Sequence, residues 1–91
     1  MSYTLHFTDD AIEDIEYLKR AGDKAALKKL ATLLKELTDH PFIGTGQPEE
    51  LKYNFSGCWS RRINNKHRLV YLIEEQAKVI ILYCRGHYED K

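Results

Sequence analysis

The chain has 91 residues, of which 43% are hydrophobic and 31% are charged, which suits one domain with a single core and leaves little room for a second. Fourteen basic and fourteen acidic side chains give a formal net charge of zero, which argues against a protein that coats nucleic acid by electrostatics alone. The sequence contains no apolar run of membrane-spanning length and no pattern of a secretion signal. We therefore expect a single domain over residues 1–91, a cytoplasmic location and no membrane partner.

The first half of the chain predicts a strand followed by two helices. Residues 2–7 alternate as strands do, and Thr8 is a suitable N-cap for a helix with an acidic first turn. Apolar residues at helical spacing then continue until Gly22, the expected stop. A second helix, capped by Asp23 and ending near His40, carries a broad leucine stripe that is better explained as core than as a partner-binding face.

The second half predicts a loop and then several strands. Two Gly and two Pro without periodicity indicate a loop over residues 41–50. The candidate strands are LKYNF at 51–55, CWSRRI at 58–63, HRLVYLI at 67–73 and the nearly continuous apolar run KVIILYCR at 78–85. An Asn64-Asn65 turn separates the second and third of these. With the short segment LKYNF left out of the count, the order βααβββ predicts an α+β domain with two helices packed on one face of a mostly antiparallel sheet.

Positive charge is concentrated in the predicted strands. Between Leu51 and Ile73 the chain has no acidic residue, and this segment holds Lys52, Arg61, Arg62, Lys66 and Arg68. Strand alternation puts Arg68 on the face opposite Leu69, and a cationic face can combine it with Arg61 or Arg62 and with Arg85. The alternative is an ordinary solvated sheet face, and the sequence leaves open which arginines converge.

Alternation in the last strand also makes a testable prediction. If the alternation is unbroken, one face is shared by Val79, Ile81, Tyr83, Arg85 and His87, with Gly86 as a candidate site for a bulge.

The two cysteines, Cys58 and Cys84, are expected to be free thiols in strands. A metal site built from Cys84, His67 and His87 would lack the paired spacing that metal ligands usually show. No metal and no cofactor are therefore expected.

The segment from Pro41 to Tyr88 resembles the YoeB/Txe branch of the RelE-like toxins, which belong to bacterial type II toxin–antitoxin pairs. The resemblance is carried by PFIGTGQPEELKYNFSGCWSRRINNKHRLVY and by YCRGHY, with matching motifs and matching spacing. It implies a microbial ribonuclease-like fold and an endoribonuclease that cuts mRNA in the ribosomal A site and so inhibits translation. It also implies a cognate antitoxin of the YefM/Axe type, and it makes a homodimer a candidate assembly.

The same motifs imply site residues. The catalytic set implied by the resemblance is Glu49, Arg68, His87 and Tyr88. Lys52 and Arg62 line the RNA path by the same matching, and Arg61 and Arg85 are added as RNA-binding candidates from the cationic face. For Arg61 a merely solvated side chain is the alternative, and His67 is a weaker catalytic candidate than His87.

The chemistry of this set fits RNA cleavage without a metal, because the 2′-hydroxyl of RNA is itself the nucleophile. Glu49 can act as base and His87 as acid, or the reverse, and Arg68 can stabilise charge on the phosphate. The sequence departs from the family pattern at Glu50 and in the extension Glu89-Asp90-Lys91. Two other functions stay open: a non-nucleolytic toxin of the same fold that binds a protein such as gyrase, and a plain RNA- or protein-binding module.

Overall fold

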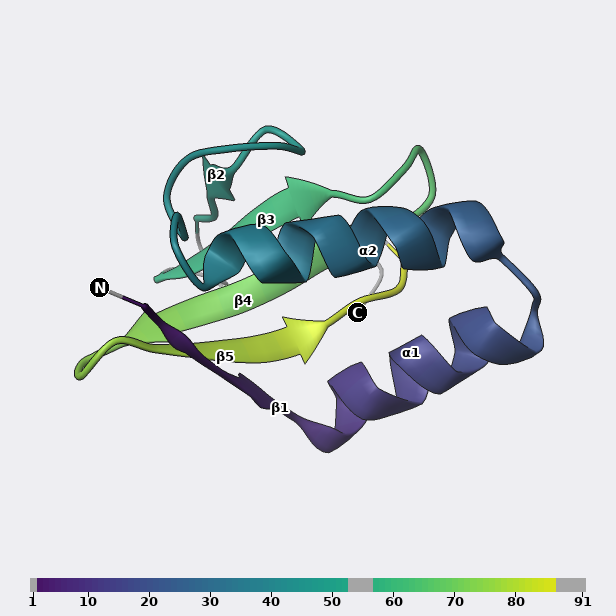
Figure 1. The fold of residues 1–91 in the computed structure, drawn as a ribbon, viewed down its shortest axis with the longest axis horizontal. Coiled ribbons are helices and arrows are strands. Elements are labelled where there is room, and N and C mark those ends of the chain that lie inside the picture. Colours follow the sequence, from purple (N-terminus) through teal and green to yellow (C-terminus); the bar gives the residue numbers. More distant parts are fainter. Residues whose placement is uncertain (1, 53–56, 87–91) are drawn as a thin grey trace.

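The computed structural model describes residues 2–52 and 57–86 and shows two helices on a five-stranded sheet. The elements are β1 (Thr4–Phe7), α1 (Asp9–Arg20), α2 (Lys24–Leu37), β2 (Glu49–Glu50), β3 (Cys58–Arg62), β4 (Arg68–Glu74) and β5 (Lys78–Tyr83). The strand order is β1-β5-β4-β3-β2, as Figure 1 shows, with β1 parallel to β5 and all other neighbours antiparallel. The predicted α+β fold is confirmed.

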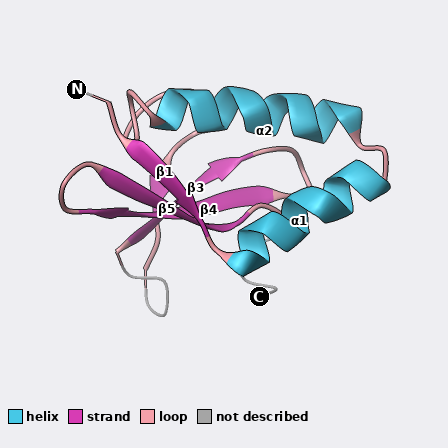
Figure 2. Cartoon of the chain, turned by 60° about the horizontal axis from the view of Figure 1, so that its bottom comes forward, coloured by secondary structure: helices cyan, strands magenta, loops and turns pink. Residues whose placement is uncertain are grey.

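Side-chain caps define where both helices begin. The Thr8 hydroxyl accepts a hydrogen bond from the Ala11 N–H at 3.1 Å, and the Asp23 carboxylate accepts one from the Ala26 N–H, also at 3.1 Å. These bonds satisfy backbone donors that have no partner within the helix. Both helices lie on the same side of the sheet (Figure 2), and no helix formed by residues 2–52 or 57–86 covers the other face.

The core lies between the helices and the sheet. Leu18 of α1 and the leucine stripe of α2 pack against the inward-facing residues of β4 and β5, including Leu69, Tyr71 and Ile81. Each of these three strand residues is fully buried. The prediction that the leucine stripe is core is therefore confirmed.

A bulge corrects the predicted alternation of β5. Ile81 pairs with Tyr71, but Tyr83 pairs with Val70, because the register shifts between Val70 and Tyr71. Tyr83 therefore lies on the face opposite Ile81, so the prediction that these two share a face is wrong. The bulge was expected at Gly86, but the alternation already breaks between Ile81 and Tyr83.

The short strand β2 comes directly before the segment LKYNF, which was predicted as a strand and of which only Leu51 and Lys52 are described. Pairing with β3 involves Glu49 and Glu50, two residues earlier than predicted, and Leu51 adds one backbone bond to Cys58. Residues 53–56 lie outside the described part of the chain. The effect is to bring Glu49 into the sheet instead of leaving it in the preceding loop.

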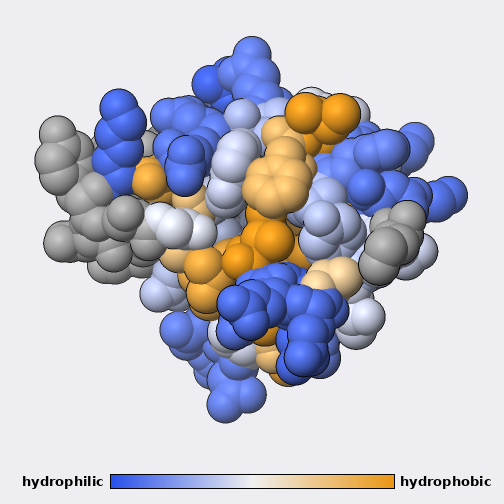
Figure 3. Space-filling model, turned by 90° about the vertical axis from the view of Figure 1, so that its left-hand side faces the viewer, coloured by the Kyte–Doolittle hydropathy of each residue, from blue (hydrophilic) through white to orange (hydrophobic). Residues whose placement is uncertain are grey.

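Some apolar surface is left uncovered. Phe42 and Ile43, in the loop after α2, are 46% and 67% exposed. Figure 3 shows apolar side chains in a band between hydrophilic ones on one side of the molecule. Within residues 2–52 and 57–86, no helix is long and apolar enough to cross a membrane.

Candidate functional site

Strand register places Glu49 on the face of the sheet that the helices leave open. Glu49 pairs with Ser60, Ser60 with Val70, and Val70 with Tyr83. Directly paired residues of antiparallel strands point to the same face, so these four form one row across the sheet. The Glu49 side chain is exposed, so its carboxylate is accessible from solvent on the open face.

Arg62 and Arg68 form the next row on the same face. Arg62 lies two residues beyond Ser60 and pairs directly with Arg68, so strand alternation puts both on the face that carries Glu49. Nη1 of Arg68 donates to the carbonyl oxygens of Asn64 at 2.9 Å and of His67 at 3.4 Å. The turn before β4 thus anchors one guanidinium nitrogen. The structure brings together an acid and two arginines.

For three further candidates, the structure gives less information about their position relative to Glu49 and Arg68. Lys52 is exposed, three residues after Glu49. His87 and Tyr88, the candidate acid and its neighbour, lie outside the described residues. Gly86 directly precedes them in the sequence, and its carbonyl oxygen accepts a hydrogen bond from the Arg68 N–H at 2.9 Å.

Arg61 is not on the open face, which corrects its predicted role. Its side chain is fully buried, because alternation along β3 turns it toward α2. Its Nη1 lies 2.9 Å from Oε1 of Glu36, and its Nε donates to the Tyr71 hydroxyl at 3.2 Å. Neither RNA binding nor solvation fits a guanidinium in this position.

Arg61 holds the loop that leads to Glu49. Its Nη2 donates to the carbonyls of His40 and Ile43, the latter at 2.7 Å, and its Nη1 donates to that of Thr45 at 3.4 Å. The Tyr71 hydroxyl adds a bond to the Pro41 carbonyl at 2.7 Å. These bonds satisfy loop carbonyls near the end of α2 that would otherwise lack partners.

Glu36, whose side chain is half-buried, is a further partner of this loop. It accepts a hydrogen bond from the Thr45 N–H at 2.8 Å. Bonds from Thr45 and the neighbouring Arg61 guanidinium lower the pKa of the Glu36 carboxyl, while burial raises the pKa of the Tyr71 hydroxyl. The ionised Glu36 and the protonated Tyr71 are thus the forms that the loop requires.

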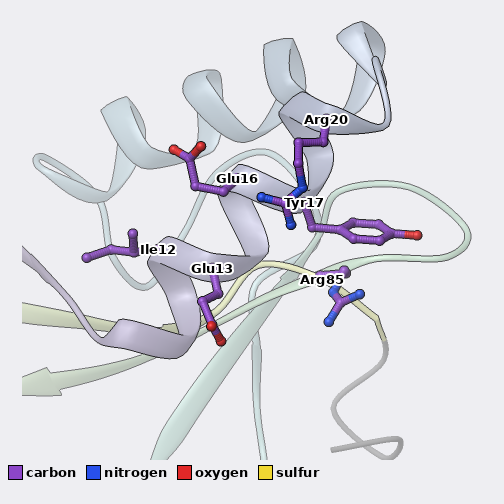
Figure 4. A pocket seen from close by; sticks show the side chains of 6 residues that line it. All are labelled: Ile12, Glu13, Glu16, Tyr17, Arg20 and Arg85. Carbon is purple, nitrogen blue, oxygen red and sulfur yellow. The ribbon is translucent and has the colours of Figure 1, made fainter.

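Arg85 also lies away from the open face. Its guanidinium carbon is 4.2 Å from the centre of the Tyr17 ring, and its Nε is 3.4 Å from Oδ1 of Asp14. Both partners belong to α1, and Figure 4 shows Arg85 beside Tyr17 in a pocket along that helix. The expected convergence of arginines from three strands is therefore corrected to Arg62 and Arg68 alone.

Two acids in the helices were missed at the sequence level. Asp14 is buried and accepts from the Cys84 N–H at 3.0 Å as well as from Arg85. Burial of Asp14 could have been predicted from its position between Ala11 and Leu18 on the apolar side of α1. Glu36 gave no such signal, because its partners come from a loop and a strand far along the chain.

The cysteines and histidines form no metal site in the parts of the chain that are described. Cys58 and Cys84 are free thiols, as predicted, but only Cys58 is in a strand, because β5 ends at Tyr83. Burial raises the pKa of the Cys58 thiol. Across residues 2–52 and 57–86 there is no cluster of three or more His, Cys, Asp or Glu side chains that could hold a metal ion.

Comparison with known proteins gives consistent similarities. Residues 7–88 match the family described as YoeB-like toxin of bacterial type II toxin-antitoxin system. Toxin YoeB of Synechocystis sp. is 45% identical over 83 residues, covering 91% of this chain and 94% of the relative. The similarity extends to the fold. A YoeB/ParE toxin from Agrobacterium tumefaciens has a TM-score of 0.87 at 35% identity, covering 93% of this chain and 99% of that one.

A Staphylococcus aureus YoeB is also similar, with a TM-score of 0.81 at 38% identity, covering 97% of this chain and 100% of that one. Its structures are described as a YoeB dimer and as a YoeB–YefM complex.

Proposed function

The chain belongs to the YoeB-like toxins of bacterial type II toxin–antitoxin systems, and from this premise we propose that it is an endoribonuclease that cuts mRNA in the ribosomal A site. The observation that carries the proposal is the shared face of Glu49, Arg62 and Arg68. A carboxylate beside two guanidinium groups on an open sheet face supplies a proton acceptor and permanent positive charge where an RNA phosphate can approach.

The proposed reaction uses the RNA's own 2′-hydroxyl. Glu49 takes its proton, the 2′-oxygen forms a bond to phosphorus, and the bond from phosphorus to the 5′-oxygen breaks. His87 gives a proton to the departing 5′-oxygen. The products are a 2′,3′-cyclic phosphate and a 5′-hydroxyl, so all atoms and protons are accounted for without a metal or cofactor.

The remaining residues act on charge and position. Arg68 faces the phosphate with a planar fork of donors and stabilises the negative charge that develops on its oxygens. Arg62 and Lys52 hold the neighbouring backbone, and Tyr88 stacks on a base or hydrogen-bonds the phosphate. Anchoring of Arg68 by the Asn64 carbonyl favours this role, because a pre-oriented guanidinium needs little reorganisation in the transition state.

The ribosome is proposed to supply substrate orientation. A domain with a formal net charge of zero has little electrostatic affinity for free RNA. Presentation of the strand in the A site would convert the reaction into one between groups that are already positioned.

A cognate antitoxin of the YefM/Axe type is proposed as the partner that neutralises the toxin. The S. aureus YoeB forms a complex with YefM and is also seen as a dimer. Exposed apolar residues, among them Phe42 and Ile43, leave surface on this chain that an antitoxin or a second copy can cover.

The test is induced expression followed by mapping of mRNA ends, comparing wild type with Glu49→Gln and His87→Gln. Loss of a general base or acid should reduce cleavage by about 10²- to 10⁴-fold. Glu50→Gln is the matched control, because Glu50 pairs with Trp59 and therefore points to the opposite face from Glu49. It should cleave close to the wild-type rate.

Three outcomes would count against the proposal. Equal cleavage by wild type, Glu49→Gln and His87→Gln would overturn the assigned roles. Intact RNA together with DNA damage would point to a gyrase-poisoning toxin of the same fold. Arrested translation with unchanged RNA ends would point to a binding module.

A further inference from the structure

Gly86 is attached to the start of β4 at two points. Its N–H donates to Nδ1 of His67 at 2.8 Å, and its carbonyl oxygen accepts from the Arg68 N–H at 2.9 Å. The strand β5 already ends at Tyr83, so these bonds fix Gly86 beyond the regular ladder. The φ of +72° at Gly86 is in the left-handed region that glycine adopts most easily.

His67 is itself held firmly by the turn that precedes β4. The side-chain oxygen of Asn64 accepts from the N–H groups of Lys66 and His67, each at 2.8 Å. The His67 carbonyl accepts from the Ile63 N–H at 3.1 Å. The imidazole therefore extends from a backbone with fixed position, which makes it a rigid acceptor for Gly86.

The bond to Gly86 defines the state of the imidazole. A backbone N–H can only donate, so Nδ1 must be the unprotonated nitrogen and the ring proton must sit on Nε2. A doubly protonated ring would instead point an N–H at the N–H of Gly86. This hydrogen bond from the Gly86 N–H to Nδ1 of His67, called the tie below, therefore exists only while His67 is neutral.

The surroundings of His67 favour that neutral form. Burial is the largest influence and lowers its pKa below the ordinary value for histidine. The charged groups that face it are Asp23 at the start of α2 and Asp14 of α1, which raise the pKa, and Lys66 and Arg85, which lower it.

We propose that His67 is a positioning residue, whose neutral imidazole fixes Gly86 beside the start of β4 and Arg68, and whose protonation releases Gly86. The inference rests on the proposed function in assigning Arg68, whose N–H is bonded to Gly86, to the phosphate. One turn then serves two parts of the site: the Asn64 carbonyl holds the Arg68 guanidinium, and His67 holds Gly86.

The direction of the pH effect follows from the lowered pKa. The unfolded chain binds a proton at His67 at a higher pH than the folded chain does, so folding stability rises with pH between the two values. The contribution of the tie is complete above the ordinary histidine pKa and is lost as pH falls through the lowered folded value.

The first experiment follows the tie itself in the full 91-residue chain. ¹⁵N spectra near pH 7.5 should show His67 with an unprotonated Nδ1 and a protonated Nε2. On acidification the amide signal of Gly86 should shift with the same midpoint as the imidazole signals of His67. A proton on Nδ1 at pH 7.5, or a Gly86 amide that ignores the titration of His67, would overturn the proposal.

Two substitutions of His67 test whether a hydrogen-bond acceptor at the position of Nδ1 is sufficient without the imidazole ring. His67→Asn places an oxygen near the position of Nδ1, whereas His67→Gln places one near that of Nε2. We expect His67→Asn to keep most of the cleavage rate and to abolish the acidic shift of the Gly86 amide, because an amide oxygen does not titrate in this range. We expect His67→Gln to lower the rate by about 10- to 100-fold, as a misplaced catalytic group does.

A control and the remaining outcomes complete the design. His6→Gln removes an exposed histidine in β1 and should change neither the rate nor the Gly86 signal. Wild-type cleavage by His67→Gln would show that His67 does not position the site. If even the wild type does not cleave RNA, the proposed function fails, while the spectra still report whether His67 holds Gly86.

Discussion

Arg61 and Arg62 are neighbours with the same side chain, yet they do different things. Strand alternation turns Arg61 toward α2, where it is fully buried, and turns Arg62 to the open face, where it is exposed. The Arg61 side chain binds Glu36 and the loop carbonyls, while Arg62 lies directly opposite Arg68 in the β3–β4 register. One arginine therefore supports the loop before β2, and the other lies on the open face, where we propose that RNA approaches.

Replacement of Arg61 should destabilise the fold strongly. Arg61→Met leaves Glu36 without its charge partner and several loop carbonyls without donors, and we expect a loss of about 3 kcal/mol. Arg61→Lys should recover little of it, because one ammonium cannot replace a fork of donors. Urea denaturation measures the change as a lower midpoint.

Arg62→Met is the matched control for that experiment. Since Arg62 is exposed, its replacement should change the free energy of unfolding by no more than about 0.5 kcal/mol. Equal losses for Arg61→Met and Arg62→Met would contradict the structural role of Arg61.

The residues of the candidate site were predictable only through the motifs that the chain shares with the YoeB/Txe branch. Those motifs imply roles for Glu49, Arg62 and Arg68, and the register places the three on one face. Arg61 and Arg85 have the same residue type, but their partners Glu36 and Asp14 lie in helices. No local pattern shows such pairs, because they depend on how the helices dock.

At the level of elements, the loop between α2 and β2 determines where Glu49 enters the sheet. It passes so close to β3 that the Gly46 carbonyl accepts from the Arg62 N–H at 2.7 Å. A Cβ at Gly46 would lie 2.9 Å from the Arg62 carbonyl oxygen, and the φ there is +84°. The glycine is thus needed both for its conformation and for the close approach.

Gly46→Ala and Gly22→Ala form an informative pair of substitutions. Gly22 also has a positive φ, of +68°, but an added Cβ there would meet nothing within 4 Å. Gly22→Ala should therefore cost only the left-handed strain, about 1 kcal/mol. Gly46→Ala should cost about 1–3 kcal/mol more, because backbone must shift to relieve the contact.

Thermal denaturation of the two variants measures this difference directly. We also expect Gly46→Ala to reduce RNA cleavage, since a displaced loop shifts Glu49, and Gly22→Ala to leave it unchanged. Equal stability of both variants would show that the close approach of the loop to β3 makes no contribution to the free energy of unfolding.

At the scale of the whole molecule, balanced charge limits what the chain can do alone. The formal net charge is zero, and Lys52, Arg62 and Arg68 are the cations assigned to the RNA path. Contact with about three phosphates predicts a slope near −2 for the logarithm of the affinity for free single-stranded RNA against the logarithm of salt concentration.

Fluorescence anisotropy with a labelled RNA over a range of salt concentrations measures this slope. Arg62→Gln should make it less steep by about 0.7, the share of one phosphate contact. A slope steeper than about −5 would instead indicate a broad cationic surface and would contradict dependence on the ribosome for substrate binding.

The sequence by itself determined the two helices, the strands other than β2, the fold class and the family. Helix caps, leucine periodicity and alternating strands are local patterns that respond to local physics, and the motifs that identify the family are continuous in the chain. Only the tertiary structure decided which of the charged residues face solvent. The bulge at Val70, the docking of α2 over β3 and the tie from His67 to Gly86 join distant segments, and burial between distant segments separates a structural arginine from one that is free to meet RNA.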